Sequence, residues 1–474
     1  MVDLLLASNR GPVSYSEEED GSLVSRRGGG GLVSALAGSH SGRHAVWVCA
    51  ALSGADRRAV RTGAVEVPGL RMLDIDEVVF RRAYDQIANS LLWFVAHLLC
   101  SPATNPTFDA GSRREWAGYE QYCATFADAL AAEASPGARV LVQDYHLSLV
   151  PALLRARRPD LRIGHFSHTP WAPPQYFRLL PDSFARSLLE GLLGADALGF
   201  LSPRWADAFG RCCADVLGAT FDGATVRHAG RTTAVAVHAL GVDRAELQAR
   251  AAQPDVRGRL DTVRDVVGDR RLLLRIDRTE LSKNIVRGLQ AYAELLRTRP
   301  QWRGRVVHLA FSYPSRHDLP EYREYTAAVQ RTAREVNEEF GTPGWLPVVL
   351  QVRDDYARSL AAYELADVLV VNPLRDGMNL VAKEGPVLSR NDLVLILSRE
   401  AGAADQLGQD ALMVNPYDVS QTAEAMHQAL LMPAAERAGR CARLADAATA
   451  LPPSAWLAAQ LAALDAVAPR IPPP

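Results

Sequence analysis

The sequence contains little lysine and few cysteines, and it lacks a hydrophobic run of membrane-spanning length. Only two of its 52 basic residues are lysine, Lys283 and Lys383. Its six cysteines form no C-x-x-C pair, so we expect buried thiols in a reduced, cytoplasmic protein and neither a disulfide framework nor a cysteine metal site. The most apolar stretch, LLWFVAHLLC at 91–100, is about half as long as a membrane span and predicts a core helix.

The charges are balanced and dispersed along the chain. The formal net charge is −2 at pH 7, and the arginines do not gather into the basic stripe that nucleic-acid binding requires. The start of the chain, MVDLLLASNR, carries an acid at position 3 and an apolar run too short for a signal peptide. We therefore expect a protein that binds neither nucleic acid nor a membrane.

Apolar runs alternate with helical patterns along the chain. The expected strands lie at 3–8, 138–143, 162–167, 197–202, 233–240, 271–276, 305–311, 347–352, 367–373, 392–398 and 411–416. Many of these runs are apolar on both faces, as strands of parallel sheets are. Helical patterns intervene, for example at 284–298 and 321–340, and the alternation predicts an α/β fold with parallel sheets.

The strands fall into two sets that divide near Gly241, and 474 residues are too many for one core. We expect an N-terminal Rossmann-like domain at 1–240, a C-terminal Rossmann-like domain at 241–452, and a helix with a Pro-rich tail at 453–474. Two doubly wound domains would turn the carboxyl ends of their strands toward a shared crevice, where ligands of such sheets bind. The motifs below lie mostly just after predicted strands.

An anion-binding pattern follows the predicted strand at 367–373. Gly377 allows a tight turn in LRDGMNLVAKE, and a helix is expected to start near Asn379. The main-chain N–H groups of its first residues would suit a phosphate; these residues are Leu380, Val381 and Ala382. Asp376 could accept hydrogen bonds from a sugar, and Glu384 from ribose hydroxyls. The alternative is an ordinary strand–loop–helix with solvated acids.

Two cations follow the predicted strand at 271–276. Arg278 and Lys283 would lie at its carboxyl end, where fixed positive charges stabilise a diphosphate leaving group as its bond breaks. Lysine is a compact point charge and arginine a planar fork, so the two are not interchangeable where geometry is tight. The alternative for Arg278 is a surface ion pair with Asp277 or Glu280.

The N-terminal half carries a second set of candidates. SNRGP follows the first strand and contains Arg10, and GGGGL, which ends at Leu32, permits close approach of the backbone to a ligand. QDYHL and FSHTPW place Asp144 and His168 after two further strands. A histidine at a strand end is more often structural than catalytic, but the neighbouring acid favours a functional role here.

Together these motifs resemble the trehalose-6-phosphate synthase family of retaining GT-B glycosyltransferases. VNPLRDGMNLVAKE, DYHL, SHTPW, SNR and DR…LSK carry the resemblance, which extends from SNRGP to beyond VNPYD. It implies two Rossmann-like domains, a C-terminal helix that crosses back to the first, and neither a metal nor a cofactor. It also implies transfer of glucose from a nucleotide sugar to glucose 6-phosphate, giving α,α-trehalose 6-phosphate.

The resemblance assigns the acceptor-binding residues. Arg10 and Arg316 would hold the acceptor phosphate. Tyr84 and Trp93 would line the acceptor pocket, and Asp144 would bind the acceptor sugar.

The resemblance also assigns the donor-binding residues. Arg278 and Lys283 would clamp the diphosphate, and His168 would lie near the donor glucose and the reacting bond. The remaining donor-binding residues implied are Gly30, Gly31, Asp376, Asn379, Leu380, Val381 and Glu384. The candidate catalytic residues are Arg278, Lys283, Asp144 and His168. Lys383 has no family role that we can assign and is expected to pack at a helix surface.

The implied reaction needs no protein nucleophile. Hydrolases that retain configuration use two carboxylates about 5 Å apart. This family instead resembles a front-face reaction, in which the leaving phosphate oxygen accepts the acceptor's proton as the new bond forms. The protein then contributes orientation and charge stabilisation.

The sequence departs from the commonest family pattern at TELSKN, HTPWA and LQVRDDYARSL. Family members that use UDP-glucose often place an aromatic residue near the position of Asp354. A carboxylate can accept two hydrogen bonds from the N1–H and N2–H₂ edge of guanine, and uracil offers no such pair. GDP-glucose is therefore favoured over UDP-glucose; the alternative is that Asp354 faces solvent and reads no base.

Two other functions stay open at this stage. A pseudo-glycosyltransferase would couple cyclitols through a C–N bond on the same fold, and a non-catalytic sensor would bind a sugar phosphate and regulate a partner. The intact PLRDGMN and the full acceptor and clamp sets favour the sugar enzyme. The sequence leaves open whether the chain forms a homo-oligomer.

Overall fold

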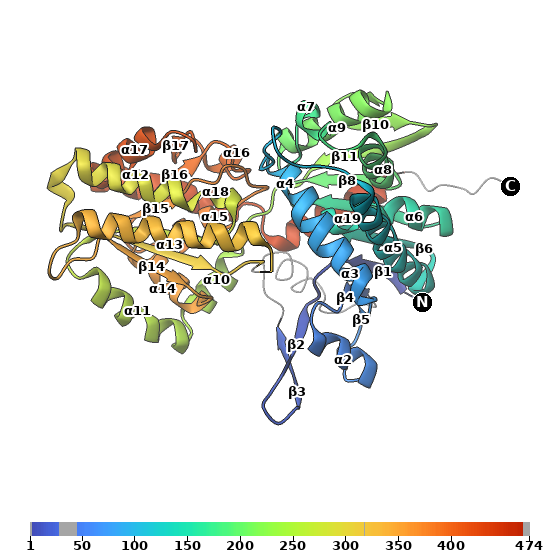
Figure 1. The fold of residues 1–474 in the computed structure, drawn as a ribbon, viewed down its shortest axis with the longest axis horizontal. Coiled ribbons are helices and arrows are strands. Elements are labelled where there is room, and N and C mark those ends of the chain that lie inside the picture. The colour runs from blue at the N-terminus through green and yellow to red at the C-terminus, as the bar shows by residue number, and fades with distance from the viewer. Residues whose placement is uncertain (1, 28–44, 317, 468–474) are drawn as a thin grey trace. The chain divides into compact units, whose positions relative to one another are not determined.

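The structure is a computed structural model that describes residues 2–27, 45–316 and 318–467. The chain divides into two units (Figure 1). Unit 1 comprises residues 1–239 and 453–474, and unit 2 comprises residues 240–452.

Unit 1 is built on a nine-stranded sheet in the described part of the chain. Its strands, in spatial order, are β5 (Leu70–Leu73), β4 (Ala45–Ala50), β1 (Val2–Ala7), β6 (Ala134–Gln143), β7 (Arg162–Ser167), β8 (Ala197–Phe200), β11 (Arg231–Val237), β10 (Thr225–His228) and β9 (Thr220–Phe221). The first seven are parallel, and β10 and β9 extend the sheet antiparallel. A separate hairpin pairs β2 (Val13–Glu17) with β3 (Leu23–Arg27).

Helices connect the strands of unit 1. They are α2 (Gly54–Thr62), α3 (Glu77–Arg81), α4 (Trp93–Ala96), α5 (Ala110–Glu133), α6 (Val150–Arg157), α7 (Pro174–Phe177), α8 (Asp182–Leu193), α9 (Pro203–Leu217) and α19 (Pro453–Ala466), with the π-helical segment η1 (Arg82–Leu92) and the short turn η2 (Tyr145–Leu147). Capping residues in the sequence set the ends of some of them, as α9 shows. The Ser202 hydroxyl accepts a hydrogen bond from the Arg204 N–H, and Gly218 ends the helix at φ 66°.

The described residues of unit 2 form a fully parallel six-stranded sheet. Its strands, in spatial order, are β14 (Val348–Val352), β13 (Val306–Tyr313), β12 (Arg271–Arg278), β15 (Val368–Val371), β16 (Val394–Ser398) and β17 (Leu412–Val414). The helices are α10 (Arg244–Ala251), α11 (Pro254–Val267), α12 (Ile285–Thr298), α13 (Pro320–Phe340), α14 (Tyr356–Leu365), α15 (Val381–Leu388), α16 (Ala404–Leu407), α17 (Val419–Leu431) and α18 (Ala434–Thr449), with the short turns η3 (Leu281–Lys283) and η4 (Pro300–Trp302).

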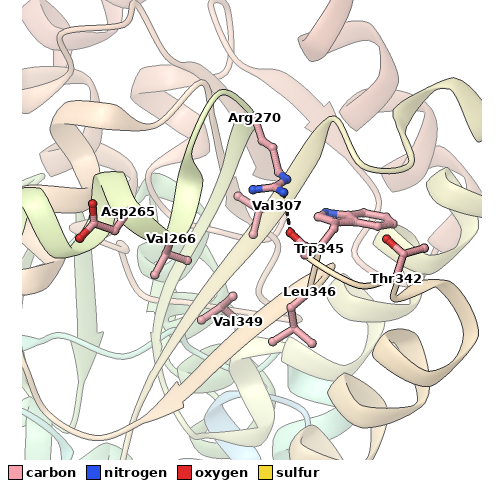
Figure 2. A pocket seen from close by; sticks show the side chains of 9 residues that line it. Asp265, Val266, Arg270, Val307, Thr342, Trp345, Leu346 and Val349 are labelled. Atoms are coloured by element: carbon pink, nitrogen blue, oxygen red, sulfur yellow. Dashed lines mark hydrogen bonds between the residues drawn. The ribbon is translucent and has the colours of Figure 1, made fainter.

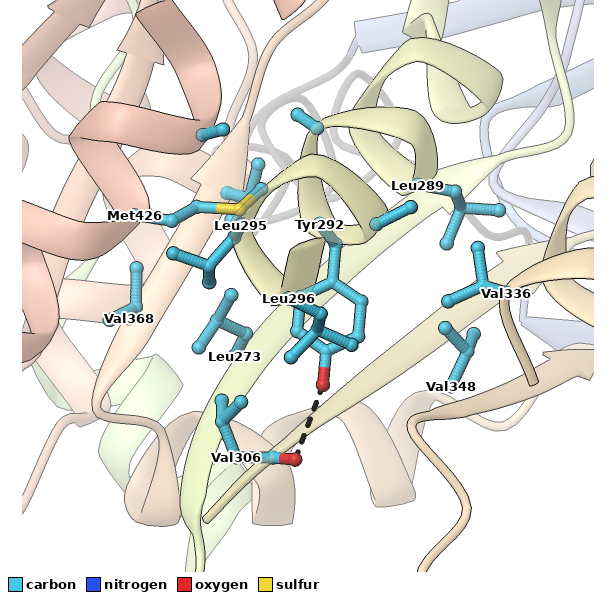
Figure 3. Close-up of a cluster of buried hydrophobic side chains, with 14 of the residues drawn as sticks. Leu273, Leu289, Tyr292, Leu295, Leu296, Val306, Val336, Val348, Val368 and Met426 are labelled. Atoms are coloured by element: carbon cyan, nitrogen blue, oxygen red, sulfur yellow. Dashed lines mark hydrogen bonds between the residues drawn. The ribbon is translucent and has the colours of Figure 1, made fainter. Parts of the chain in front are cut away.

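The core of unit 2 fills the space between one face of this sheet and α12, α13 and α17 (Figure 3). Leu273, Leu289 and Leu296 are fully buried in it, and each such side chain stabilises the fold by about 1.5–3 kcal/mol. The hydroxyl of buried Tyr292 donates to the Val306 carbonyl at 3.2 Å, which satisfies the polar end of the ring. A second layer is formed by α14, α15 and α18.

The parallel part of each sheet reverses its strand order at one point among the described residues. In unit 1 the reversal lies between β1 and β6, and in unit 2 it lies between β12 and β15. Ligands of open α/β sheets bind beyond the carboxyl ends of the strands at such a point. Arg10 and Asp144 follow the two strands at the first reversal, and Arg278 and Asp376 lie at or after the strands at the second.

The strand predictions are confirmed, since all eleven expected runs are strands. The short strands β4 and β5, the hairpin β2–β3 and the antiparallel strands β9 and β10 were not predicted. The core helix predicted at 91–100 is wrong beyond Ala96, because His97 leaves the helix and Leu98 takes a φ of 56°. No helix in the part of the chain that the structure describes is long and apolar enough to cross a bilayer.

Candidate active site

Arg10 follows an anchored turn at the end of β1. The Ser8 hydroxyl donates to the Arg10 carbonyl at 2.7 Å and accepts from the Trp47 indole N–H at 2.7 Å. The Asn9 side chain accepts from the Tyr122 hydroxyl at 2.5 Å. Ser8 and Asn9 are buried, whereas Arg10 is exposed. The buried contacts therefore fix the backbone while the guanidinium stays accessible to a ligand.

Asp144 is held in an uncommon backbone conformation directly after β6. Its φ of 71° is rare for a residue with a side chain, and such strain persists where the surroundings impose it, often at functional sites. Its N–H donates to the Phe166 carbonyl at 2.7 Å, and its carboxylate accepts from the His168 N–H at 3.1 Å. The end of β7 thus fixes both the backbone and the side chain of Asp144.

Tyr84 and Trp93 approach the residues next to Asp144. The Tyr84 ring stacks on His146 with centroids 5.7 Å apart, and the Trp93 ring lies 5.9 Å from that of Tyr145. Tyr84 lies on η1, and π-helical segments frequently occur at functional sites. The structure therefore brings together three of the residues predicted for the acceptor.

His168 is an uncharged group at neutral pH. Burial lowers its pKa to about 3, and neighbouring His165 adds to this effect. Its Nε2 lies 2.9 Å from Oε1 of Gln143. His168 can therefore form hydrogen bonds beside Asp144 but brings no positive charge to a leaving group at pH 7.

In unit 2, Lys283 is fixed at both its side chain and its backbone. Its Nζ donates to Asp376 Oδ2 at 2.5 Å, and its side chain is only 11% exposed. Its carbonyl accepts from the Arg275 guanidinium at 2.7 Å, and that guanidinium also donates to Asp277 at 2.7 Å. The buried Arg275–Asp277 pair thus supports the turn that carries Lys283.

Arg278 ends β12 and makes an ion pair with Glu280 over 2.8 Å. This is the partner that the alternative interpretation named, but the pair is not a surface pair. Glu280 is 0% exposed, whereas the Arg278 side chain is 48% exposed. The buried carboxylate therefore holds one side of the guanidinium.

Asn379 organises the start of α15. It has a φ of 79°, its amide N–H donates to Asp376 at 3.1 Å, and its amide oxygen accepts from the Ala382 N–H at 3.1 Å. The expectation that the Ala382 N–H faces a phosphate is therefore wrong, because Asn379 caps it. Leu380 and Val381 begin the helix, where main-chain N–H groups have no intrahelical acceptor.

Glu384 lies on the first turn of α15 and is partly buried. The Tyr363 hydroxyl donates to its carboxylate at 3.1 Å. Burial raises the pKa of Glu384 to about 7, although the Tyr363 hydrogen bond acts in the opposite direction. Its charge therefore changes near neutral pH.

Two adjacent acids follow β14 and differ in their contacts. Asp355 accepts from the Arg358 N–H at 3.1 Å at the start of α14 and pairs with Arg259 over 3.2 Å. Asp354 is exposed. Asp355 is therefore fixed by contacts within unit 2. The recognition of the donor base by Asp354 stays a prediction.

Arg316 lies in unit 2, whereas the other predicted acceptor residues lie in unit 1. It takes a φ of 48°, and its guanidinium donates to the Tyr322 hydroxyl at 2.5 Å. Gly30 and Gly31 lie outside the described residues. Among the described residues, no group of three or more His, Cys, Asp and Glu side chains could hold a metal ion.

Comparison with known proteins gives the family. The model described as Glycosyltransferase family 20 matches residues 3–466, nearly the whole chain. The chain belongs to glycosyltransferase family 20.

Two curated relatives of this family 20 chain differ in length. Over 375 residues it is 35% identical to the "Bifunctional trehalose-6-phosphate synthase/phosphatase" of Thermoproteus tenax, and the match covers 78% of this chain and 50% of that protein. Over 456 residues it is 31% identical to "Alpha,alpha-trehalose-phosphate synthase (UDP-forming) 2" of Aspergillus fumigatus, covering 93% and 92%. The chain thus spans half the length of the first relative and most of the second.

A solved structure agrees with the family. The alpha,alpha-trehalose-phosphate synthase (UDP-forming) from Burkholderia xenovorans in complex with glucose-6-phosphate matches 98% of this chain and 99% of its own, with a TM-score of 0.84 and 27% identity. The prediction of an α/β fold of the GT-B type with two Rossmann-like domains is confirmed.

The family 20 motifs did not reveal every residue that shapes the site. Sequence reasoning named Glu280 only as a surface partner and gave no role to Arg275 or Tyr363. The signal available was position, because Arg275 lies on a predicted strand, Asp277 directly follows that strand, and Glu280 lies between two predicted cations. Their burial depends on packing that the motifs do not encode.

The expectation that Lys383 packs at a helix surface is wrong. Its side chain is 0% exposed, and its Nζ donates to the Leu240 carbonyl at 2.5 Å and to the Gln406 side chain. Leu380 and Val387, which lie three residues before and four residues after it on the same helix face, are apolar and could have indicated burial.

A pocket of about 370 Å³ lies elsewhere in unit 2 (Figure 2). Val307 and Val349, near the amino ends of β13 and β14, line it together with Arg270, whose guanidinium donates to the Gly344 carbonyl at 2.7 Å. Ligands of α/β sheets bind at the opposite, carboxyl ends. This pocket is therefore separate from the candidate site.

Proposed function

We propose that the chain is a retaining glucosyltransferase, which transfers glucose from a nucleoside-diphosphate glucose to glucose 6-phosphate and forms α,α-trehalose 6-phosphate. The observation that carries this proposal is the cluster of Arg278, Lys283 and Asp376 with the start of α15 at the strand-order reversal of unit 2. Fixed cations and a helix start at that point suit a diphosphate.

Unit 2 would bind the donor. Arg278 and Lys283 would contact the diphosphate, the N–H groups of Leu380 and Val381 would donate to its oxygens, and Glu384 would accept from the ribose hydroxyls. Lys283 now pairs with Asp376 over 2.5 Å. A bound nucleoside-diphosphate glucose would offer its diphosphate to Lys283 and its glucose hydroxyls to Asp376.

Unit 1 would supply most of the acceptor contacts. Tyr84 and Trp93 flank Tyr145 and His146, and rings of this kind suit the apolar faces of a sugar. Asp144 would accept a hydrogen bond from an acceptor hydroxyl. Arg10 of unit 1 and Arg316 of unit 2 would contact the acceptor phosphate, as the family resemblance implies.

The chemical step exchanges one bond for another on the same face of the donor sugar. The bond from C1 to the diphosphate oxygen breaks as the acceptor hydroxyl oxygen bonds to C1. The hydroxyl proton passes to the leaving phosphate oxygen. Arg278 and Lys283 would stabilise the charge that builds on this oxygen, and neutral His168 would contribute a hydrogen bond near C1.

Two indications about the donor base oppose each other. Exposed Asp354 can accept two hydrogen bonds from a guanine edge, which favours GDP-glucose. The Aspergillus and Burkholderia proteins are named UDP-forming, which favours UDP-glucose. With both donors at equal concentration, an Asp354→Asn variant should lose GDP-glucose turnover selectively if Asp354 reads guanine.

The proposal is tested by incubating GDP-glucose or UDP-glucose with glucose 6-phosphate. Release of the nucleoside diphosphate and formation of an α,α-linked disaccharide phosphate, read by NMR, are expected for the wild type and not for Arg278→Ala/Lys283→Ala. Binding of both substrates without turnover would favour a sensor instead. Turnover only with an amino-cyclitol phosphate would favour a pseudo-glycosyltransferase.

The proposed location is the cytoplasm. All six cysteines are free thiols, and five of them are buried. Such thiols are typical of a reducing compartment.

A further inference from the structure

Glu280 is a buried carboxylate with an incomplete set of hydrogen bonds. It is 0% exposed, and one of its oxygens, Oε1, lies 2.8 Å from Arg278 Nη1 and accepts from the Ser315 hydroxyl at 2.8 Å. Its other oxygen, Oε2, is buried and has no hydrogen-bond partner in the described part of the chain. A buried acceptor without a partner is costly, so its presence requires an explanation.

The charge of Glu280 persists at neutral pH. Burial alone would raise its pKa, but the cations Arg278, Arg316 and Lys283 outweigh burial and lower the pKa to about 2. Glu280 is therefore an anion surrounded by the cations proposed to bind substrate anions.

In the proposed function, the cations around Glu280 bind the anionic groups of both substrates. Arg278 would contact the donor diphosphate, and Arg316, next to Ser315, would contact the acceptor phosphate. The backbone of Glu280 also accepts the Lys283 N–H at 3.0 Å. Through its carboxylate or its backbone, Glu280 thus contacts the segments that carry all three cations.

We propose that Glu280 is a positioning residue whose buried carboxylate orients the donor cation Arg278 and, through Ser315, the segment that carries the acceptor cation Arg316. The inference rests on the proposed function for the identity of the two anions. Glu280 would also occupy these cations before substrate arrives, so that stray phosphate competes poorly for them. Substrate phosphates would then meet cations that are already oriented, at little reorganisation cost.

The test compares Glu280→Gln with the wild type in two measurements. Without the carboxylate charge the cations attract anions more strongly, so calorimetric affinity for pyrophosphate and for inorganic phosphate should rise about tenfold. Without the orientation of Arg278, kcat should fall at least tenfold. A merely structural loss would instead weaken anion binding together with kcat. Glu280→Asp, which keeps the charge, should leave anion affinity near that of the wild type.

Glu364 provides the matched control. It is also a buried acid of unit 2 and pairs with Arg257 and Arg390, each over 3.0 Å. Glu364→Gln should lower the melting temperature and leave anion affinity and kcat unchanged. The inference is overturned if Glu280→Gln behaves like this control, or if it lowers anion affinity.

Double variants separate the two substrates. In an Arg278→Ala background, Glu280→Gln should no longer change pyrophosphate affinity, and in an Arg316→Ala background it should no longer change phosphate affinity. An undiminished effect in both backgrounds would overturn the inference. Because these are binding measurements, they remain readable even if the wild type shows no glucosyl transfer and the proposed function fails.

Discussion

Lys283 is one of only two lysines in a chain that otherwise uses arginine. Its ammonium reaches Asp376 from a short turn whose carbonyl is held by Arg275, and its side chain is almost buried. A compact charge on a flexible stem fits such a bend, whereas a planar guanidinium requires more room and a wider set of acceptors.

We therefore predict that Lys283→Arg is as damaging as Lys283→Ala. Either change removes one preorganised contact to the leaving group, which is typically worth about 2.7–4 kcal/mol of barrier, or 100- to 1,000-fold in kcat. Steady-state kinetics with both substrates measure this. Arg297→Lys, at an exposed pair with Glu339, is the control and should change little. Near wild-type activity in Lys283→Arg would show that charge alone suffices.

Glu384 predicts a pH dependence of donor binding. Its pKa is raised to about 7 by burial, so the carboxylate that would accept from ribose hydroxyls is charged above pH 7 and becomes protonated below it. The Kd for the nucleoside diphosphate should therefore rise several-fold as pH falls from 8 to 6. Calorimetry across this range measures it. In Glu384→Gln the dependence should be flatter; an equally steep profile would assign it to another group.

At the scale of elements, the start of α15 depends on one residue in a left-handed conformation. Asn379 contributes both a side-chain cap and a φ of 79°, which asparagine tolerates better than most residues. Removing the cap costs about 1 kcal/mol, and imposing the same φ on alanine adds roughly another 1 kcal/mol.

Asn379→Ala should therefore destabilise unit 2 more than Asn379→Gly, by about 1 kcal/mol, since glycine relieves the strain but not the lost cap. Urea unfolding measures the difference. Both variants should weaken diphosphate binding, because the Asp376 contact is lost in each. Equal stability of the two variants would mean that the backbone conformation has changed.

The sequence predicted the strands better than it predicted which charged side chains are buried. Runs apolar on both faces located the eleven strands, and the parallel order then placed Arg10, Asp144, Arg278 and Asp376 at carboxyl ends. The sequence did not show that Glu280 and Lys383 are buried, because burial of a charged side chain depends on partners distant in the chain, such as Ser315 and Leu240. The π-helical form of η1 likewise has no clear sequence pattern.

At the scale of the whole molecule, the last helix joins the first unit rather than the unit that precedes it. Trp456 on α19 is 1% exposed and lies edge-on to Phe166 of β7, with ring centroids 4.9 Å apart. Leu464 of the same helix lies over Gly164, where a Cβ would approach within 3.2 Å of it. Helix α19 therefore contributes to the core of unit 1.

Trp456→Ala should lower the stability of unit 1 by about 3–5 kcal/mol, the usual cost of removing a fully buried tryptophan side chain. Differential scanning calorimetry should show the transition of unit 1 shifted and that of unit 2 retained. Ala458→Ser, at an exposed position of the same helix, should shift neither. A uniform shift of a single transition would mean that the two units unfold as one.

The fully buried amine of Lys383 has a consequence for how this molecule responds to alkalinity. Burial lowers its pKa from 10.5 to about 7. Between pH 7 and 10.5 the amine is therefore protonated in the unfolded chain but not in the native chain. The free energy of unfolding consequently increases with pH in this range. Lys383→Met lacks this term. The melting temperature of Lys383→Met minus that of the wild type should be larger at pH 6 than at pH 9. A difference that stays constant with pH would contradict the lowered pKa.

The same amine donates a hydrogen bond to the Leu240 carbonyl. The N–H of the next residue, Gly241, donates to the Leu451 carbonyl at 2.7 Å. The polypeptide enters unit 2 at 240 and leaves it at 452. The residues where the chain enters and leaves unit 2 are therefore hydrogen-bonded to each other near α15. Because burial disfavours the charged form of Lys383, its protonation as pH falls would destabilise this part of the unit.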